Sequence, residues 1–117
     1  VKCSTSICYN EKFFVPRENT ENGEVSGNTI FSYYQDGNIL WADYSGGEVV
    51  RGHLIGTVAE NGELDFYYQH INVQKQIRVG VCHSVPKVLE NGKIELSEKW
   101  KWLNGDKSEG SSLLVEV

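Results

Sequence analysis

Six two-residue turn signals divide this chain from one end to the other. Each contains a glycine, and the six are Asn22-Gly23, Asp36-Gly37, Gly46-Gly47, Asn61-Gly62, Asn91-Gly92 and Asn104-Gly105. Such pairs accept the positive φ angles that tight β-hairpins require. The segments between them are rich in Val, Ile, Tyr, Phe and Trp. The chain is therefore predicted to be a β-meander without a long helix.

The segments between the turns predict about eight strands. Several are longer than the ~5–6 residues common in globular proteins, which suits the tilted strands of a barrel. A single sheet of this size is expected to close on itself, because open edges invite aggregation. We therefore predict an all-β fold with one closed antiparallel up-and-down β-barrel. Its strands are expected over residues 13–17, 29–35, 39–45, 48–58, 63–71, 76–89, 93–103 and 110–117.

Length and charge limit the classes of function. The 117 residues suffice for one domain with a buried core, so residues 1–117 are expected to form a single barrel domain. The net charge is −5 and the basic residues are scattered, so nucleic acid is not an expected partner. No apolar run approaches the ~20 residues that span a bilayer, so a membrane is not an expected partner either.

The three cysteines are Cys3, Cys8 and Cys82. A small secreted scaffold usually carries a denser and even set, so we expect free thiols in a reducing cytoplasm. A bond between Cys3 and Cys8 across a short loop is the alternative. Neither a Cys-x-x-Cys pair nor a Cys/His cluster gives zinc spacing, and the sequence contains no phosphate loop or dinucleotide fingerprint. We therefore expect no metal and no cofactor.

The alternation of side chains is clean over residues 93–102. One face carries lysines and other polar residues, and the opposite face carries Ile94, Leu96, Glu98, Trp100 and Trp102. A period of two places the second set inside the barrel. Glu98 is then the one carboxylate on an otherwise apolar and aromatic face of this strand.

Three further strands are less uniform. From Leu64 to His70 the even-numbered residues lead from apolar side chains to a titratable one. Over residues 77–84 the odd-numbered and even-numbered sets compete for the interior. Over residues 110–117 the even-numbered set is favoured slightly, because Gly110 and Ser112 would leave room for Trp100 and Trp102 across the hairpin.

An inward Glu98 needs a partner or a proton, because burying a lone carboxylate is costly. Its candidate partners are Arg78, Arg51, the hydroxyl of Tyr33, Tyr44 or Tyr68, and internal water. The functional interpretation is a polar anchor for a ligand, or a general acid/base with a raised pKa that acts together with His70. The alternative is a structural hydrogen-bond network or a residue at the barrel rim.

Aromatic side chains are numerous enough to line a pocket. They are Phe31, Tyr33, Trp41, Tyr44, Phe66, Tyr68, Trp100 and Trp102. In an eight-stranded barrel such residues either fill the core or surround one small ligand. The candidate ligand-binding residues are Tyr33, Tyr44, Tyr68, His70, Glu98 and Trp100, and no catalytic residue is assigned.

Motifs along most of the chain resemble those of one family. They are the run over residues 29–56, Tyr68-Gln69-His70, the run over residues 98–102 with Asn104-Gly105-Asp106, and Gly110-x-Ser112 with Glu116. They look like those of small bacterial proteins that are often labelled N-acetylglutamate synthase. The resemblance begins at about Phe13 and leaves residues 1–10 as an N-terminal extension. It implies a lipocalin-like (calycin) barrel from the bacterial cytoplasm.

These observations leave three functions open. The leading hypothesis is a barrel that binds a small apolar or aromatic molecule in its interior. The second is an enzyme of undetermined class that uses Glu98, His70 and barrel tyrosines. The third is a structural module, with a homodimer as its expected assembly. Acetyl transfer from acetyl-CoA is not expected, because the chain lacks a glycine-rich loop followed by a helix for the cofactor phosphates.

Overall fold

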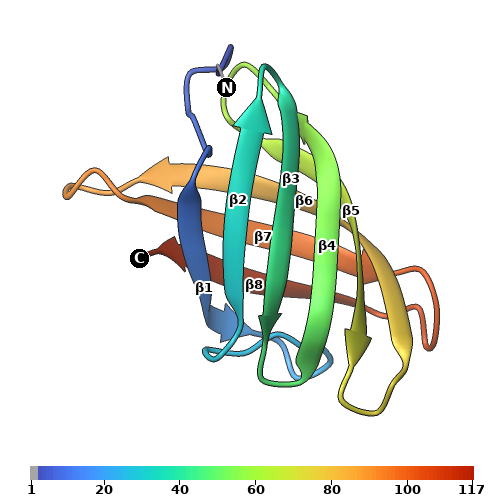
Figure 1. The fold of residues 1–117 in the computed structure, drawn as a ribbon. Helices are drawn as coiled ribbons and strands as arrows, with labels where there is room; N and C mark the ends of the chain where they lie inside the picture. The colour runs from blue at the N-terminus through green and yellow to red at the C-terminus, as the bar shows by residue number, and fades with distance from the viewer. Residues whose placement is uncertain (1–2) are drawn as a thin grey trace.

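The computed structural model of the protein describes residues 3–117 and confirms the predicted closed barrel. Consecutive strands pair antiparallel, and β8 pairs with β1. In Figure 1, β1 to β5 run upright in front, and β6 to β8 cross behind them. The strands are β1 (Lys12–Asn19), β2 (Ile30–Asp36), β3 (Ile39–Gly46), β4 (Val49–Val58), β5 (Leu64–Asn72), β6 (Ile77–Val88), β7 (Ile94–Trp102) and β8 (Glu109–Glu116). Among the described residues, no helix is long and apolar enough to cross a membrane.

The turn dipeptides account for most of the connections. Positive φ angles occur at Gly37, Gly46, Gly47, Gly62, Gly92 and Gly105, which belong to five of the six dipeptides. The sixth dipeptide, Asn22-Gly23, lies in a longer connection over residues 20–29, which we call the β1–β2 loop. The turn between β5 and β6 lacks glycine and uses Lys75 at a φ of 62°.

Alternate residues of each strand fill the barrel interior. β7 buries the set from Ile94 to Trp102 that the alternation predicted. The even-numbered residues of β6 and β8 also face inward, since Cys82, Ser84 and Ser112 are buried. A Cβ at Gly110 would collide with the ring of Trp100 on β7. The small residue expected beside this tryptophan is therefore confirmed.

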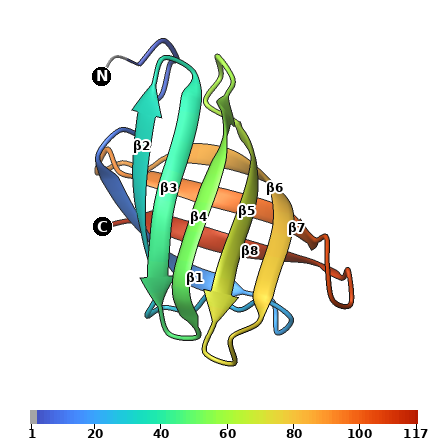
Figure 2. The same cartoon turned by 45° about the vertical axis from the view of Figure 1, so that its right-hand side comes forward.

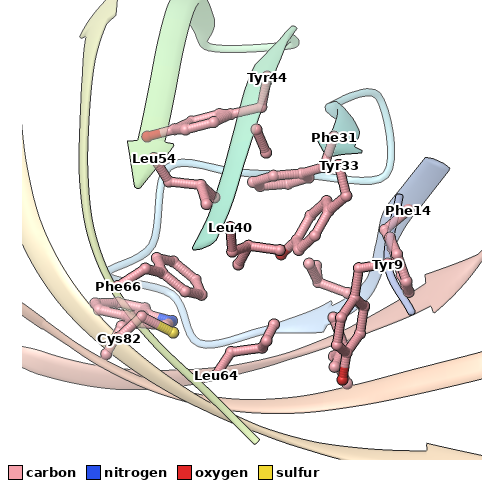
Figure 3. Packing of buried hydrophobic residues seen from close by; sticks show 14 of the residues in the cluster. Tyr9, Phe14, Phe31, Tyr33, Leu40, Tyr44, Leu54, Leu64, Phe66 and Cys82 are labelled. Atoms are coloured by element: carbon pink, nitrogen blue, oxygen red, sulfur yellow. The ribbon is translucent and has the colours of Figure 1, made fainter. Parts of the chain in front are cut away.

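The N-terminal segment covers one end of the barrel, which we call the closed end. Tyr9 is fully buried there, and its hydroxyl donates a hydrogen bond to the carbonyl of Gly62 at 2.6 Å. Its backbone N–H donates to the Gln35 side chain at 2.9 Å. The ring lies beside Phe14 and Tyr33, with centroids 6.4 and 6.2 Å apart (Figure 3). The closed end is thus packed with side chains.

A disulfide joins Cys3 to Cys8 within this segment, so the prediction of free thiols at these two positions is wrong. Their Cα atoms are 5.6 Å apart, a separation that a disulfide spans. Backbone hydrogen bonds from Ser4 to Gly37 and from Ser6 to Glu60 hold the loop against two turns. The odd cysteine count misled the prediction because the third cysteine, Cys82, is buried alone inside the barrel. Residues 1 and 2 of the predicted extension lie outside the described residues.

The β1–β2 loop lies at the opposite end, which we call the loop end. Figure 2 shows this loop next to the β3–β4 and β5–β6 turns. The hydroxyl of Thr29 bonds the carbonyl of Gly46 at 3.0 Å, and the backbone N–H of Thr20 bonds the carbonyl of Ser111 at 3.0 Å. Hydrogen bonds hold this cover in place, and Val25 is its one residue that packs against the hydrophobic core of the described residues.

Candidate ligand-binding site

A cavity lies in the half of the barrel nearest the β1–β2 loop, and its volume is about 40 Å³. At roughly 10–15 Å³ for each water molecule, it has room for about three. Its walls come from all eight strands and from the loop itself. They are Asn19, Gly23, Glu24, Val25, Phe31, Tyr44, Leu54, Phe66, Tyr68, His70, Cys82, Glu98, Trp100, Trp102 and Ser112. Aromatic walls with a few polar groups are typical of small-molecule sites.

Glu98 is the deepest charged group of the cavity and is only 7% exposed. The hydroxyls of Ser112 and Ser84 donate hydrogen bonds to its two carboxyl oxygens, at 2.8 and 3.1 Å. Burial raises the pKa of Glu98 to about 7, although the serine hydrogen bonds lower it. The carboxyl group is therefore satisfied by neutral partners and has no countercharge among its hydrogen-bond partners.

Strand register explains these partners. Ser84 on β6 lies directly opposite Glu98 on β7, and Glu98 lies directly opposite Ser112 on β8. Residues opposite one another on antiparallel strands point to the same face. The inward position and the hydrogen bonding of Glu98 are thus as predicted. Of the predicted partners, Arg78 binds another carboxylate and Arg51 is exposed. None of the three tyrosine hydroxyls is hydrogen-bonded to Glu98 among the described residues, and internal water stays a prediction.

His70 on β5 joins the cavity wall to the β1–β2 loop. Its Nε2 lies 2.8 Å from Glu24 Oε1, and its Nδ1 lies 2.8 Å from the Tyr44 hydroxyl. An ionised carboxylate only accepts hydrogen bonds, so Nε2 carries the proton and Nδ1 accepts from Tyr44. Burial lowers the pKa of His70 more than Glu24 raises it, which keeps the ring neutral. The expected acid/base pair of His70 with Glu98 does not form, since each has other partners.

Glu24 of the β1–β2 loop accepts hydrogen bonds from three side chains of the barrel wall. Arg78 Nη1 lies 2.6 Å from Oε2, His70 contacts Oε1, and Asn72 Nδ2 lies 3.2 and 3.3 Å from the two oxygens. Burial raises the pKa of Glu24, but these hydrogen bonds and the charge of Arg78 outweigh it and lower the pKa. Arg78 also lies over the ring of Trp102, 4.0 Å from its centroid. The loop thus places a carboxylate in a pocket of donors.

Two further contacts fix the loop over the cavity. The indole Nε1 of Trp102 donates to the carbonyl of Asn22 at 3.0 Å, and the side chain of Asn19 donates to the carbonyl of Val25 at 2.8 Å. Gly23, Glu24 and Val25 line the cavity from this side. The loop is therefore the cover of the site.

Comparison with known families gives a match that covers almost the whole chain. A family model described as "Avidin-like protein" matches residues 7–117. The chain belongs to the avidin-like family. This family agrees with the eight-stranded closed barrel and with the calycin-like fold that the sequence predicted. No curated protein and no solved structure matches the chain, and the N-acetylglutamate synthase label is not supported.

The avidin-like barrel brings five of the six candidate residues to the cavity. These five are Tyr44, Tyr68, His70, Glu98 and Trp100, and their role in ligand binding stays a prediction. Tyr33 does not line the cavity. It lies two positions beyond Phe31 toward the closed end of β2, where its ring packs 4.8 Å from that of Phe14. Its hydroxyl is buried and has no hydrogen-bond partner among the described residues.

Trp41 was expected among the pocket aromatics and instead lies on the outer face of the avidin-like barrel. β3 buries Leu40, Ala42 and Tyr44, so the alternation turns Trp41 outward. Its ring stacks on that of Tyr34, with centroids 6.1 Å apart. The homodimer expected from the sequence stays a prediction.

Sequence reasoning missed the contributions of Glu24, Asn72 and Asn22. Glu24 and Asn22 lie in a loop without periodicity, so no pattern marked them. Asn72 follows His70 by two positions, which places it on the same face of β5. Extending the alternation by two residues was therefore the available signal for Asn72. Arg78 was named as a partner for the wrong carboxylate, although it belongs to the inward set of β6.

Proposed function

We propose that this avidin-like protein binds a small organic molecule in the barrel cavity, with an apolar or aromatic body and a polar end. Avidin-like barrels typically bind small molecules. The walls offer Phe31, Phe66, Tyr68, Trp100 and Trp102 as apolar contacts. Burial of apolar surface against such rings supplies affinity, and a few polar groups supply orientation.

The observation that carries this proposal is Glu98. Its carboxyl group lines the cavity and its two hydrogen bonds come from neutral serines. A carboxylate has about four acceptor positions, so these two bonds leave capacity for a donor. With a pKa of about 7, the same group also donates when it is protonated. A ligand amide or hydroxyl that reaches Glu98 would replace water there.

The covered cavity is too small for most ligands. About 40 Å³ holds a few water molecules, whereas drug-sized ligand sites measure ~300–1,000 Å³. The strands of a closed barrel are fixed by their hydrogen-bond ladders on both sides. Entry of a ligand therefore requires the β1–β2 loop to move, because the loop belongs to no strand ladder and is held mainly by side-chain hydrogen bonds.

Binding of benzamide and toluene tests the role of Glu98. Both have the same ring, but only benzamide donates and accepts hydrogen bonds. We expect ligand-detected NMR to show both bound, with benzamide about tenfold tighter, the size of one net hydrogen bond. Glu98→Gln should reduce the preference for benzamide at pH 8, where the wild-type carboxyl group is ionised.

Glu90→Gln is the matched control, since Glu90 lies exposed in the β6–β7 turn at the closed end. It removes the same charge far from the cavity and should leave both affinities unchanged. The proposal fails if neither molecule binds. It also fails if Glu98→Gln and Glu90→Gln give the same benzamide preference as the wild type.

A further inference from the structure

Donors from two adjacent strands, β5 and β6, converge on one point at the loop end. Arg78 lies near the start of β6 and His70 near the end of β5, and the two lie directly opposite each other in the ladder. Asn72 lies two positions after His70, on the same face. All three side chains point to the carboxylate of Glu24, at 2.6 to 3.3 Å. A guanidinium, an imidazole N–H and an amide N–H at these distances form a carboxylate-binding pocket.

The carboxylate that fills this pocket belongs to a loop and not to a strand of the barrel. Glu24 lies in the β1–β2 loop, whereas all three donors belong to strands β5 and β6 of the barrel wall. The donors are themselves fixed independently of Glu24. His70 is held by the Tyr44 hydroxyl at 2.8 Å, and Arg78 lies on the Trp102 ring. The side-chain Oδ1 of Asn72 accepts from the backbone N–H of Gln76 at 2.9 Å. The pocket would therefore persist if Glu24 left it.

Arg78 keeps unused capacity in this arrangement. Its Nε is buried and has no hydrogen-bond partner among the described residues. Its Nη1 binds Glu24, and its Nη2 lies 4.0 Å from Asp106, a distance at the limit of an ion pair. A guanidinium binds a carboxylate best through two parallel hydrogen bonds. Glu24 therefore accepts only one of the hydrogen bonds that the Arg78 guanidinium can donate.

We propose that Glu24 is an internal substitute for a ligand carboxylate, and that the natural ligand is a small carboxylic acid whose carboxylate displaces Glu24 from Arg78, His70 and Asn72. This inference rests on the proposed function and names the ligand class. The apolar body of the acid would lie between Tyr44, Tyr68 and Trp102. Displacement of Glu24 would release the β1–β2 loop, which is the movement that the small covered cavity requires.

The pair 4-phenylbutyrate and 4-phenylbutyramide tests the proposal, because the two molecules differ in charge and hardly in shape. The measured quantity is the ratio of their affinities, obtained by ligand-detected NMR at pH 7. Glu24→Ala removes the internal competitor and should raise the ratio in favour of the carboxylate at least tenfold. Adding Arg78→Gln to Glu24→Ala should return the ratio to its wild-type value. A variant that merely opens the cavity should change both affinities by the same factor, and such a change leaves their ratio unaltered.

Glu21→Ala is the matched control, because Glu21 is an exposed residue of the same loop. It removes the same charge and should leave the ratio unchanged. Glu24→Gln, which keeps the size of the side chain, is a second variant and should raise the ratio as Glu24→Ala does. Trp102 fluorescence reports the loop, since its indole donates to Asn22, and it should change when phenylbutyrate binds the wild type.

The outcomes separate the two proposals. If both molecules bind Glu24→Ala with the wild-type ratio, the cavity is a binding site but Glu24 is not a ligand substitute. If the ratio rises equally in Glu21→Ala, the effect is one of overall charge and the inference is wrong. If neither molecule binds any variant, the proposed function fails together with the inference.

Discussion

The two ends of this barrel are closed by different means. At the closed end, the ring of Tyr9 enters the core and packs against Phe14 and Tyr33. At the loop end, the β1–β2 loop crosses the opening and the carboxylate of Glu24 holds it to Arg78 and His70. One cover is mainly apolar packing backed by a disulfide, and the other is held mainly by polar contacts.

The difference shows where stability and function can separate in a small barrel. Apolar packing has no substitute in solution, because water does not replace the lost contacts. A carboxylate bound by an arginine does have substitutes, because water and other anions compete for the same donors. Changes at the closed end should therefore alter the stability of the fold, and changes at the loop end should alter access to the cavity.

The largest expected effect is that of Tyr9→Ala. Removing a fully buried aromatic ring leaves a cavity, and such changes typically cost about 3–5 kcal/mol of unfolding free energy. The hydrogen bond to Gly62 is lost as well. Urea unfolding measures the cost. Tyr67→Ala is the control, because Tyr67 is 63% exposed on β5, and its cost should stay within about 0.5 kcal/mol. If Tyr9→Ala and Tyr67→Ala lost the same unfolding free energy, the packing of Tyr9 at the closed end would not stabilise the fold.

Glu98, midway between the two ends, should give the barrel a pH dependence. Its pKa is about 7 when folded, against an ordinary value of 4.5. Between these two values the unfolded chain has lost the proton that the folded chain keeps, so stability falls as the pH rises from about 4.5 to 7. The loss is about 3 kcal/mol. Glu98→Gln, which does not titrate, should lack this component when the unfolding free energies of the two proteins are compared at pH 4.5 and 8.

The fold was predictable because its signals are local and repeated. Positive-φ glycines mark five connections, and the alternation of β7 shows its inner face without reference to any other strand. Ambiguity remained where both faces of a strand carry small or apolar side chains, as in β6. There, only pairing with β5 and β7 decides which set is buried.

The site was predictable only in part, because it depends on contacts between distant segments. Glu98 stood out as a carboxylate among apolar neighbours, but its serine partners follow from the register of two hairpins. The register of the β6–β7 hairpin could have been counted outward from Asn91-Gly92. The contact of Glu24 with Arg78 spans 54 positions and begins in a loop, so no periodicity indicates it.

Removal of the disulfide should have an intermediate effect and be confined to the closed end. Cys3 and Cys8 are five positions apart, and the chain-entropy relation gives about 2 kcal/mol for so short a loop. Cys3→Ser with Cys8→Ser should lower the unfolding free energy by about that amount and leave benzamide binding unchanged. A thiol count on the unfolded wild-type protein should find one reactive thiol, from Cys82. Three thiols would contradict the disulfide.

The disulfide between Cys3 and Cys8 bears on the cellular compartment of the protein. Disulfides are typical of proteins that mature in oxidising compartments. The cytoplasmic location expected from the sequence stays a prediction, and the disulfide does not favour it. Expression of the double serine variant beside the wild type in a reducing cytoplasm should give the two proteins equal stability, because neither then carries the bond.

The smallest effect on stability is expected for Glu24→Ala at the loop end. Its partners Arg78 and Asn72 regain water when the carboxylate is removed, so the unfolding free energy should fall by only about 1 kcal/mol. The loop should respond more than the fold. Hydrogen exchange of the Gly23 amide, which is bonded within the loop, should become faster, while exchange of the Tyr9 amide at the closed end stays unchanged.

Acid should reproduce this loosening in the wild-type protein. The pKa of Glu24 lies below its ordinary value of 4.5, so the contribution of its carboxylate is fully present above pH 4.5. It is lost as the pH falls further through the folded pKa. Exchange of the Gly23 amide, corrected for its intrinsic pH dependence, should therefore rise only below that point in the wild type and show no such step in Glu24→Ala. The same step in both proteins would mean that another group holds the loop. Equal acceleration at Gly23 and Tyr9 would mean that the two ends open together, and the contrast between them would then be wrong.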